Sequence, residues 1–204
     1  MIELMQRAIV IPVLTIERVG DAAPLARALA AGGLSVLEVT LRTPAALEAI
    51  TAIAADVPEA VVGSGTCLTA ADVERSAKAG AKFAVSPGLT PDILAADAIP
   101  LLPGVATASE LMAGLQAGLS TFKFFPAVPA GGTAMLKAWA GPFADARFCP
   151  TGGIDVATAP EFLALPNVLC VGGGWVAPKP LIDAGDWAGI TRLARSAAAL
   201  AQRR

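Results

Sequence analysis

A lysine lies inside an apolar stretch of the chain, in the string TFKFFP (121–126). Alternate residues of a strand point to opposite faces, so Lys123 takes the face opposite to its two flanking phenylalanines and shares its own face with Phe125. Burial lowers the pKa of a lysine, and the neutral amine is the form that attacks a carbonyl carbon. Lys123 is therefore a candidate Schiff-base lysine. The alternative is a side chain that reaches solvent or pairs with a carboxylate to fill space.

A carboxylate and a guanidinium share one face of a second apolar stretch, SVLEVTLRT (35–43). Arg42 would lie roughly 13 Å beyond Glu38 along a strand. Carbon–carbon cleavage through a Schiff base needs a group that carries protons, and a carboxylate facing the lysine can do so. A guanidinium binds a carboxylate through two parallel hydrogen bonds, which suits Arg42 to the acid group of a 2-oxo acid. A structural Glu–Arg or Glu–Lys ion pair explains the same residues.

Two glycine-rich turns follow the last two apolar stretches, CPTGGID (149–155) and CVGGGW (170–175). Glycine lets a backbone approach a ligand closely, and the loops after the last two strands of a barrel commonly hold phosphate through N–H groups. Tight turns between strand and helix are the structural alternative. The candidates for an anion site here are Thr151, Gly152, Gly153, Gly173 and Gly174.

The elements that must position these residues alternate along the chain. Ala- and Leu-rich stretches predict helices, with starts at Thr69 and Thr107. Short β-branched stretches between them predict strands at 9–16, 35–42, 60–66, 83–88, 100–105, 121–126, 147–153 and 168–175. Repeated βα units predict a parallel sheet, and eight of them favour a closed barrel over an open sheet with two edges.

We therefore predict an α/β fold, a (β/α)8 TIM barrel in one domain over residues 1–204. Active sites of such barrels gather at the C-terminal ends of the strands. The ends of the third and fourth predicted strands add Thr66 and Pro87 to the rim of that site.

Composition excludes several classes of chemistry. The chain has no histidine and no tyrosine, so acid–base work falls to carboxylates, lysine or water, and a zinc site is not expected. Three cysteines without CxxC spacing favour reduced thiols in the cytoplasm. A net charge of −2 argues against a nucleic-acid partner. The apolar segment 8–16 predicts a buried strand rather than a signal peptide, and no apolar run reaches the ~18 residues of a membrane span.

Several strings resemble one enzyme family, the 2-keto-3-deoxy-6-phosphogluconate aldolases, also known as 4-hydroxy-2-oxoglutarate aldolases. The resemblance runs from about residue 8 to the last helix. The strings are LEVTLRT (37–43), VGSGT (62–66), SPGLT (86–90), LLPGV (101–105), FKFFPA (122–127), GPF (141–143), RFCPTGG (147–153) and VLCVGGGW (168–175). The resemblance implies a homotrimeric, cytoplasmic class I aldolase of the Entner–Doudoroff pathway without metal or organic cofactor. Its reaction yields pyruvate and glyceraldehyde 3-phosphate.

The resemblance also implies roles for individual residues. Lys123 matches the Schiff-base lysine and Glu38 the carboxylate that carries protons. The residues that match the substrate pocket are Arg42 and Thr66 around the pyruvyl carboxylate, Pro87 and Phe125 in the wall, and Thr151, Gly152, Gly153 and the turn 172–174 at the phosphate-bearing end.

Two departures from the family pattern bear on the substrate. The family usually has GGSW where this chain has glycine at position 174, so a phosphate-binding hydroxyl is missing. It often has Ser or Thr at the position of Asp155, whose carboxylate would repel a phosphate beside it. These departures leave open an aldolase that acts mainly on 4-hydroxy-2-oxoglutarate or an unphosphorylated sugar acid. Other interpretations are a phosphate-binding barrel isomerase or synthase, and a non-catalytic sugar-phosphate binder.

Overall fold

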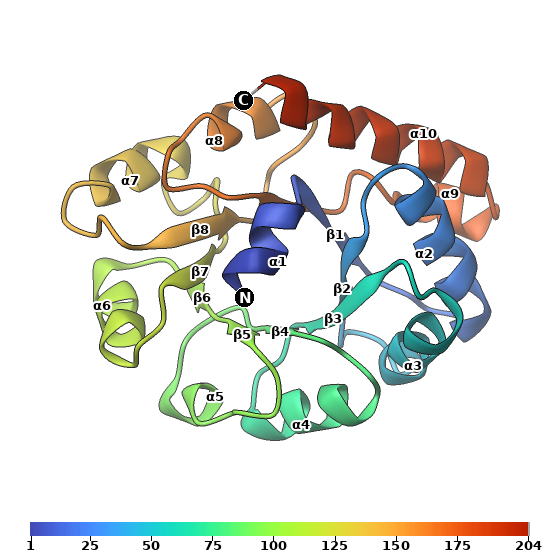
Figure 1. Cartoon of the computed structure of the whole chain (residues 1–204), viewed down its shortest axis with the longest axis horizontal. Helices are drawn as coiled ribbons and strands as arrows, with labels where there is room; N and C mark the ends of the chain where they lie inside the picture. Colours follow the sequence, from blue (N-terminus) through green and yellow to red (C-terminus); the bar gives the residue numbers. More distant parts are fainter. Residues whose placement is uncertain (204) are drawn as a thin grey trace.

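The computed structural model describes residues 1–203, so residue 204 of the range predicted as one domain lies outside the described part. Parallel strands form a ring with helices around its outside (Figure 1). The strands are β1 (Val10–Leu14), β2 (Val36–Thr40), β3 (Val61–Gly65), β4 (Ala84–Val85), β5 (Leu101–Leu102), β6 (Gly104–Val105), β7 (Thr121–Phe124), β8 (Arg147–Pro150) and β9 (Val171–Gly173). This arrangement confirms the predicted α/β barrel.

The predicted strand 100–105 is divided by Pro103 into β5 and β6, which is why eight predicted strands appear as more segments. The order β5-β4-β3-β2-β1-β9 makes one sheet and β6-β7-β8 another. Pro103 joins the two sheets on one side, since its carbonyl accepts the N–H of Lys123 at 2.8 Å. A bridge between Thr151 and Gly172 joins them on the other side. The ring is thereby closed.

Helices follow most strands and cover the outside of the ring. They are α1 (Ile2–Arg7), α2 (Ala22–Ala31), α3 (Ala46–Asp56), α4 (Ala70–Lys78), α5 (Pro91–Leu94), α6 (Ala108–Gln116), α7 (Gly132–Trp139), α8 (Ala159–Leu163), α9 (Lys179–Asp183) and α10 (Trp187–Ala198), with 3-10 turns η1 (Val19–Asp21) and η2 (Ala199–Arg203). Thr69 and Thr107 begin α4 and α6, as predicted, and the structure adds a capping box at each of them. No helix of the described residues is long and apolar enough to cross a membrane.

The predicted alternation along the strands is confirmed by what the side chains contact, since all residues of β2 and β7 are buried. Phe122 and Phe124 are fully buried in the layer between strands and helices, where Phe124 meets the ring of Trp139 edge-on at 5.3 Å. Lys123, between the two phenylalanines, points into the barrel and lines a cavity there. β2 shows the same alternation, because Leu37 packs outward while its neighbour Glu38 faces inward.

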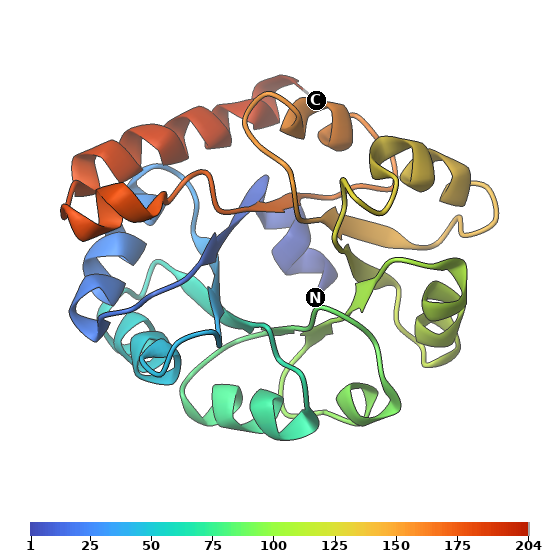
Figure 2. The ribbon, with the colours of Figure 1, turned by 180° about the vertical axis from the view of Figure 1, so that it is seen from behind.

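The end of the barrel at which the strands begin is closed by α1, which the sequence did not predict. α1 lies across the middle of the ring in Figure 1 and behind it in the reverse view of Figure 2. Met5 is fully buried there in an apolar cluster that includes Val36 and Phe83 from the barrel interior. The opposite end, where the strands finish, is left for the site.

Candidate active site

Lys123 and Glu38 form a buried ion pair inside the barrel. Lys123 Nζ lies 3.0 Å from Glu38 Oε1, and the two side chains are 7% and 4% exposed. The ring of Phe125 lies 5.2 Å from Nζ and covers the ammonium on another side. A buried charge of this kind is stable only with a partner. The predicted lysine and carboxylate therefore meet, from strands 85 residues apart in sequence.

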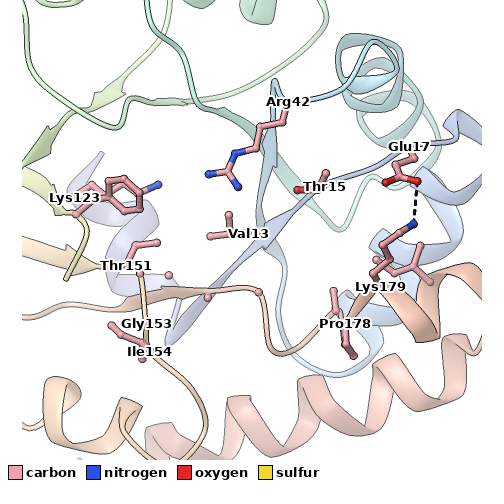
Figure 3. Close-up of a pocket in the computed structure, with 17 residues that line it drawn as sticks. Val13, Thr15, Glu17, Arg42, Lys123, Thr151, Gly153, Ile154, Pro178 and Lys179 are labelled. Atoms are coloured by element: carbon pink, nitrogen blue, oxygen red, sulfur yellow. Dashed lines mark hydrogen bonds and ion pairs between the residues drawn. The ribbon is translucent and has the colours of Figure 1, made fainter. Parts of the chain in front are cut away.

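A cavity of about 420 Å³ opens above this pair at the C-terminal ends of the strands. In Figure 3 the side chains of Lys123 on β7, Arg42 after β2 and Thr151 after β8 point into it. The predicted residues that line it are Arg42, Lys123, Phe125, Thr151, Gly152, Gly153, Gly172, Gly173 and Gly174. Glu38 lies beside Lys123 rather than in the lining.

Arg42 lies two residues beyond the end of β2 and is exposed to the cavity. No hydrogen bond or ion pair joins its guanidinium to another residue in the described part of the chain. An unpaired guanidinium beside the lysine can take the carboxylate of a 2-oxo acid with two parallel hydrogen bonds.

The two glycine-rich turns form the wall opposite Arg42. Gly152 and Gly153 have φ of 105° and 79°, a region that favours glycine. A Cβ on Gly172 would overlap the hydroxyl of Thr151, so that glycine gives Thr151 its place. The N–H groups of Gly153 and Gly174 donate to no other described residue, and they remain available to an anion.

Asp155 and Gly174, the two departures from the family pattern, differ in their position relative to the cavity. Asp155 Oδ1 accepts the N–H groups of Ala157 and Thr158 at 3.0 and 2.9 Å, and Asp155 is not a lining residue of the cavity. Hydrogen bonds from Thr158 lower the pKa of this carboxyl. The carboxylate of Asp155 is therefore hydrogen-bonded within its own turn. Gly174, by contrast, lines the cavity directly.

Two predicted residues lie away from the lining. Thr66 follows β3 with φ of 61°, an unusual value for a residue with a side chain. Pro87 lines a smaller hollow with Cys67 and Ser86 instead. Both are on the same rim of the barrel, but neither lines the cavity above Lys123.

The outer part of the cavity was not predicted. Lys179 Nζ at the start of α9 pairs with Glu17 Oε2 at 2.9 Å and Asp183 Oδ1 at 3.0 Å (Figure 3 shows the Glu17 contact). The unpredicted lining residues are Val13, Thr15, Glu17, Ile154, Ala177, Pro178, Lys179 and Ile182. Alternation along the predicted strand 9–16 was a signal for two of them, since positions 13 and 15 share a face.

A closed βα barrel that pairs a buried lysine with a carboxylate below an open cavity defines the class of protein, an aldolase. The family model for the KDPG and KHG aldolases matches residues 1–193. The chain belongs to this family, which confirms the resemblance found in the sequence.

Individual relatives agree with this assignment. The KHG/KDPG aldolase of Escherichia coli (strain K12) is 53% identical over 191 residues, which cover 92% of this chain and 90% of that protein. The KDPG aldolase from Legionella pneumophila, with pyruvate captured at low pH as a covalent carbinolamine intermediate, has a TM-score of 0.94 at 48% identity and 96% coverage of both chains. The aldolase of Zymomonas mobilis ZM4 with 3-phosphoglycerate has a TM-score of 0.91 at 53% identity, over 97% of this chain and 94% of that one.

Proposed function

We propose that this chain cleaves 2-keto-3-deoxy-6-phosphogluconate (KDPG) to pyruvate and glyceraldehyde 3-phosphate through a Schiff base on Lys123, as a step of the Entner–Doudoroff pathway. The observation that carries the proposal is the buried contact of 3.0 Å between Lys123 Nζ and Glu38 Oε1 at the floor of an open cavity. The double name of the Escherichia coli relative supports 4-hydroxy-2-oxoglutarate as a second substrate.

Each residue of the pair has a defined part in the proposed reaction. Arg42 holds the carboxylate of the 2-oxo acid while Lys123 Nζ attacks the C2 carbonyl. Glu38 carries two protons, one after the other, from Nζ to the C2 oxygen, which leaves as water while an iminium forms between Nζ and C2. Glu38 then takes the proton of the C4 hydroxyl, the C3–C4 bond breaks, and its electron pair passes into the iminium to give an enamine. Protonation at C3 and hydrolysis release pyruvate.

The phosphate-bearing end of KDPG would lie against the glycine-rich turns. The free N–H groups of Gly153 and Gly174 support this position, as does the absence of a side chain that would block it. Backbone N–H groups bind phosphate without adding a fixed charge. Phosphate binding therefore survives the missing hydroxyl at Gly174, with a smaller preference than a serine would give.

Borohydride trapping tests this function. Pyruvate plus borohydride should add one reduced pyruvyl group to Lys123 and inactivate the enzyme, whereas Lys123→Ala should abolish labelling and cleavage. Lys82→Ala is the matched control and should keep both. A label on Lys82 or Lys137 would contradict the assignment, and a wild-type protein that binds sugar phosphates without labelling would be a binder rather than an aldolase.

We also propose that the protein is a homotrimer in the cytoplasm, as the family resemblance implies. Leu68, Val128 and Val156 are exposed apolar side chains that an interface can cover. Sedimentation equilibrium distinguishes a trimer from the monomer of 20.5 kDa.

A further inference from the structure

The wall of the cavity formed by the end of β1 and the residues that follow it presents three side chains in order. Val13, Thr15 and Glu17 all line the cavity, and Figure 3 shows the Thr15 hydroxyl between Arg42 and Glu17. The register pairs Val13 with Glu38 on β2, so Val13 marks the level of the reacting pair. Thr15 lies two residues further on, about 6–7 Å closer to the opening. Its hydroxyl is therefore placed to meet the substrate beyond the bond that breaks.

The hydrogen bonds around Thr15 decide which way its proton points. Thr40 Oγ1 lies 2.9 Å from the carbonyl oxygen of Leu14 and 3.2 Å from Thr15 Oγ1. A hydroxyl has one proton and two lone pairs, and a carbonyl only accepts. Thr40 therefore gives its proton to Leu14. In the contact between the two hydroxyls Thr15 is then the donor, which leaves the lone pairs of Thr15 Oγ1 toward the cavity.

We propose that Thr15 is a specificity-determining residue that accepts a hydrogen bond from the substrate hydroxyl one carbon beyond the cleaved bond. This inference rests on the proposed function. In KDPG that group is the C5 hydroxyl, which becomes the C2 hydroxyl of glyceraldehyde 3-phosphate. It can donate to Thr15 without disturbing the bond from Thr15 to Thr40.

The second substrate of the proposed function lacks such a donor. In 4-hydroxy-2-oxoglutarate the fifth carbon is a carboxylate, which only accepts hydrogen bonds when ionised. This carboxylate faces the lone pairs of Thr15 Oγ1 unless Thr15 gives up its hydrogen bond to Thr40. The same hydroxyl therefore favours KDPG and disfavours the dicarboxylate, independently of how the phosphate is held.

A pair of aldehydes tests this inference in the condensation direction with pyruvate. Glyceraldehyde 3-phosphate carries the hydroxyl, and 3-phosphooxypropanal has the same phosphate and length without it. Thr15→Val should lower the wild-type preference for the first aldehyde, measured as a ratio of kcat/KM, by roughly 2- to 13-fold, as expected for one neutral hydrogen bond. Thr15→Ser should restore it, because serine keeps the acceptor.

Thr43→Val is the matched control, since Thr43 Oγ1 donates to the Ile16 carbonyl at 2.6 Å outside the cavity lining. It should leave the preference unchanged. An unchanged preference in Thr15→Val, or an equal fall with both aldehydes, would overturn the inference while labelling of Lys123 by pyruvate stays intact. Loss of that labelling in the wild-type protein would overturn the proposed function itself.

Discussion

The backbone of Gly65 lies directly against the carboxylate of Glu38. A Cβ at Gly65 would lie 2.6 Å from Glu38 Cγ and 2.8 Å from Cδ, closer than a Cβ atom approaches other heavy atoms in folded proteins. The carboxylate of Glu38 is therefore in contact with β3 as well as with Lys123 Nζ. The position of Glu38 depends on the absence of a side chain on the neighbouring strand.

Gly65→Ala should displace the Glu38 carboxylate from Lys123. We expect Schiff-base formation with pyruvate to persist and cleavage to slow toward the roughly 10²-fold loss that follows removal of a general base. Burst labelling and kcat are the measurements. Gly141→Ala, where a Cβ meets nothing within 4 Å, is the control and should keep wild-type rates. A normal kcat in a folded Gly65→Ala protein would show that Glu38 has room to adjust.

Glu38→Gln keeps the shape of the side chain and removes its basicity. It should slow cleavage of KDPG and exchange of the pyruvate methyl protons by roughly 10²–10⁴-fold, because both steps need the same proton carrier. Proton NMR in deuterated buffer follows the exchange. Exchange at the wild-type rate would mean that another group carries the proton.

Arg42→Ala should weaken binding of 2-oxo acids by about 1.5–3 kcal/mol, the range for a hydrogen bond to a charged group. The loss should appear in KM for substrate and in the concentration of pyruvate needed for half-maximal labelling. Arg27→Ala is a suitable control, since Arg27 bonds the Asp56 carbonyl at 2.9 Å on the surface. Equal effects of the two substitutions would remove Arg42 from the site.

Gly174→Ser should raise the preference for phosphorylated over unphosphorylated substrate by roughly 10- to 150-fold, corresponding to about 1.5–3 kcal/mol for a hydroxyl on a phosphate. The turn can accept the change, because φ at Gly174 is not positive and a Cβ meets only the Val13 carbonyl at 3.5 Å. Rates with 4-hydroxy-2-oxoglutarate should change little. Unchanged discrimination in a stable variant would mean that the phosphate does not reach this turn.

The capping box of α6 makes a pH-dependent contribution to stability. Burial acts to raise the pKa of the Glu110 carboxyl, but hydrogen bonds from the N–H of Ala106 and from Thr107 outweigh it and lower the pKa. A lowered folded-state pKa stabilises the protein above the unfolded value of about 4.3, and this stabilisation is lost as the pH falls through the folded value. Glu110→Gln should flatten this part of the stability profile in urea titrations. An identical acid slope would contradict it.

The contacts that sequence patterns predicted are those with a local cause. Alternation along a strand is enough to send Lys123 and Glu38 inward. The helix starts at Thr69 and Thr107 are also local, because each threonine caps the N–H of a residue three positions further on. Closure of the ring then allows the lysine and the carboxylate to meet, because residues that point inward from different strands share the barrel interior.

The remaining features depend on contacts that no local pattern carries. Lys179 and Glu17 are 162 residues apart and meet only because β9 pairs with β1. α1 spans six residues, too short for a periodic pattern, and its place is decided by the apolar end of the barrel that it covers. The predicted strand 168–175 is shortened to Val171–Gly173: Gly172 and Gly173 still pair with Ile11 and Pro12 of β1, whereas Gly174 lies beyond the strand and lines the cavity.

The helix α1 closes the barrel at the end where the strands begin. Substrate must then enter, and both products must leave, through the opposite end. The pyruvyl group is attached at the floor of the cavity, and the aldehyde lies nearer to the opening. On the proposed mechanism the aldehyde departs first and pyruvate last, so the enzyme follows an ordered sequence of release. Pyruvate then competes with substrate for the empty enzyme, whereas the aldehyde meets only the form that still carries the enamine.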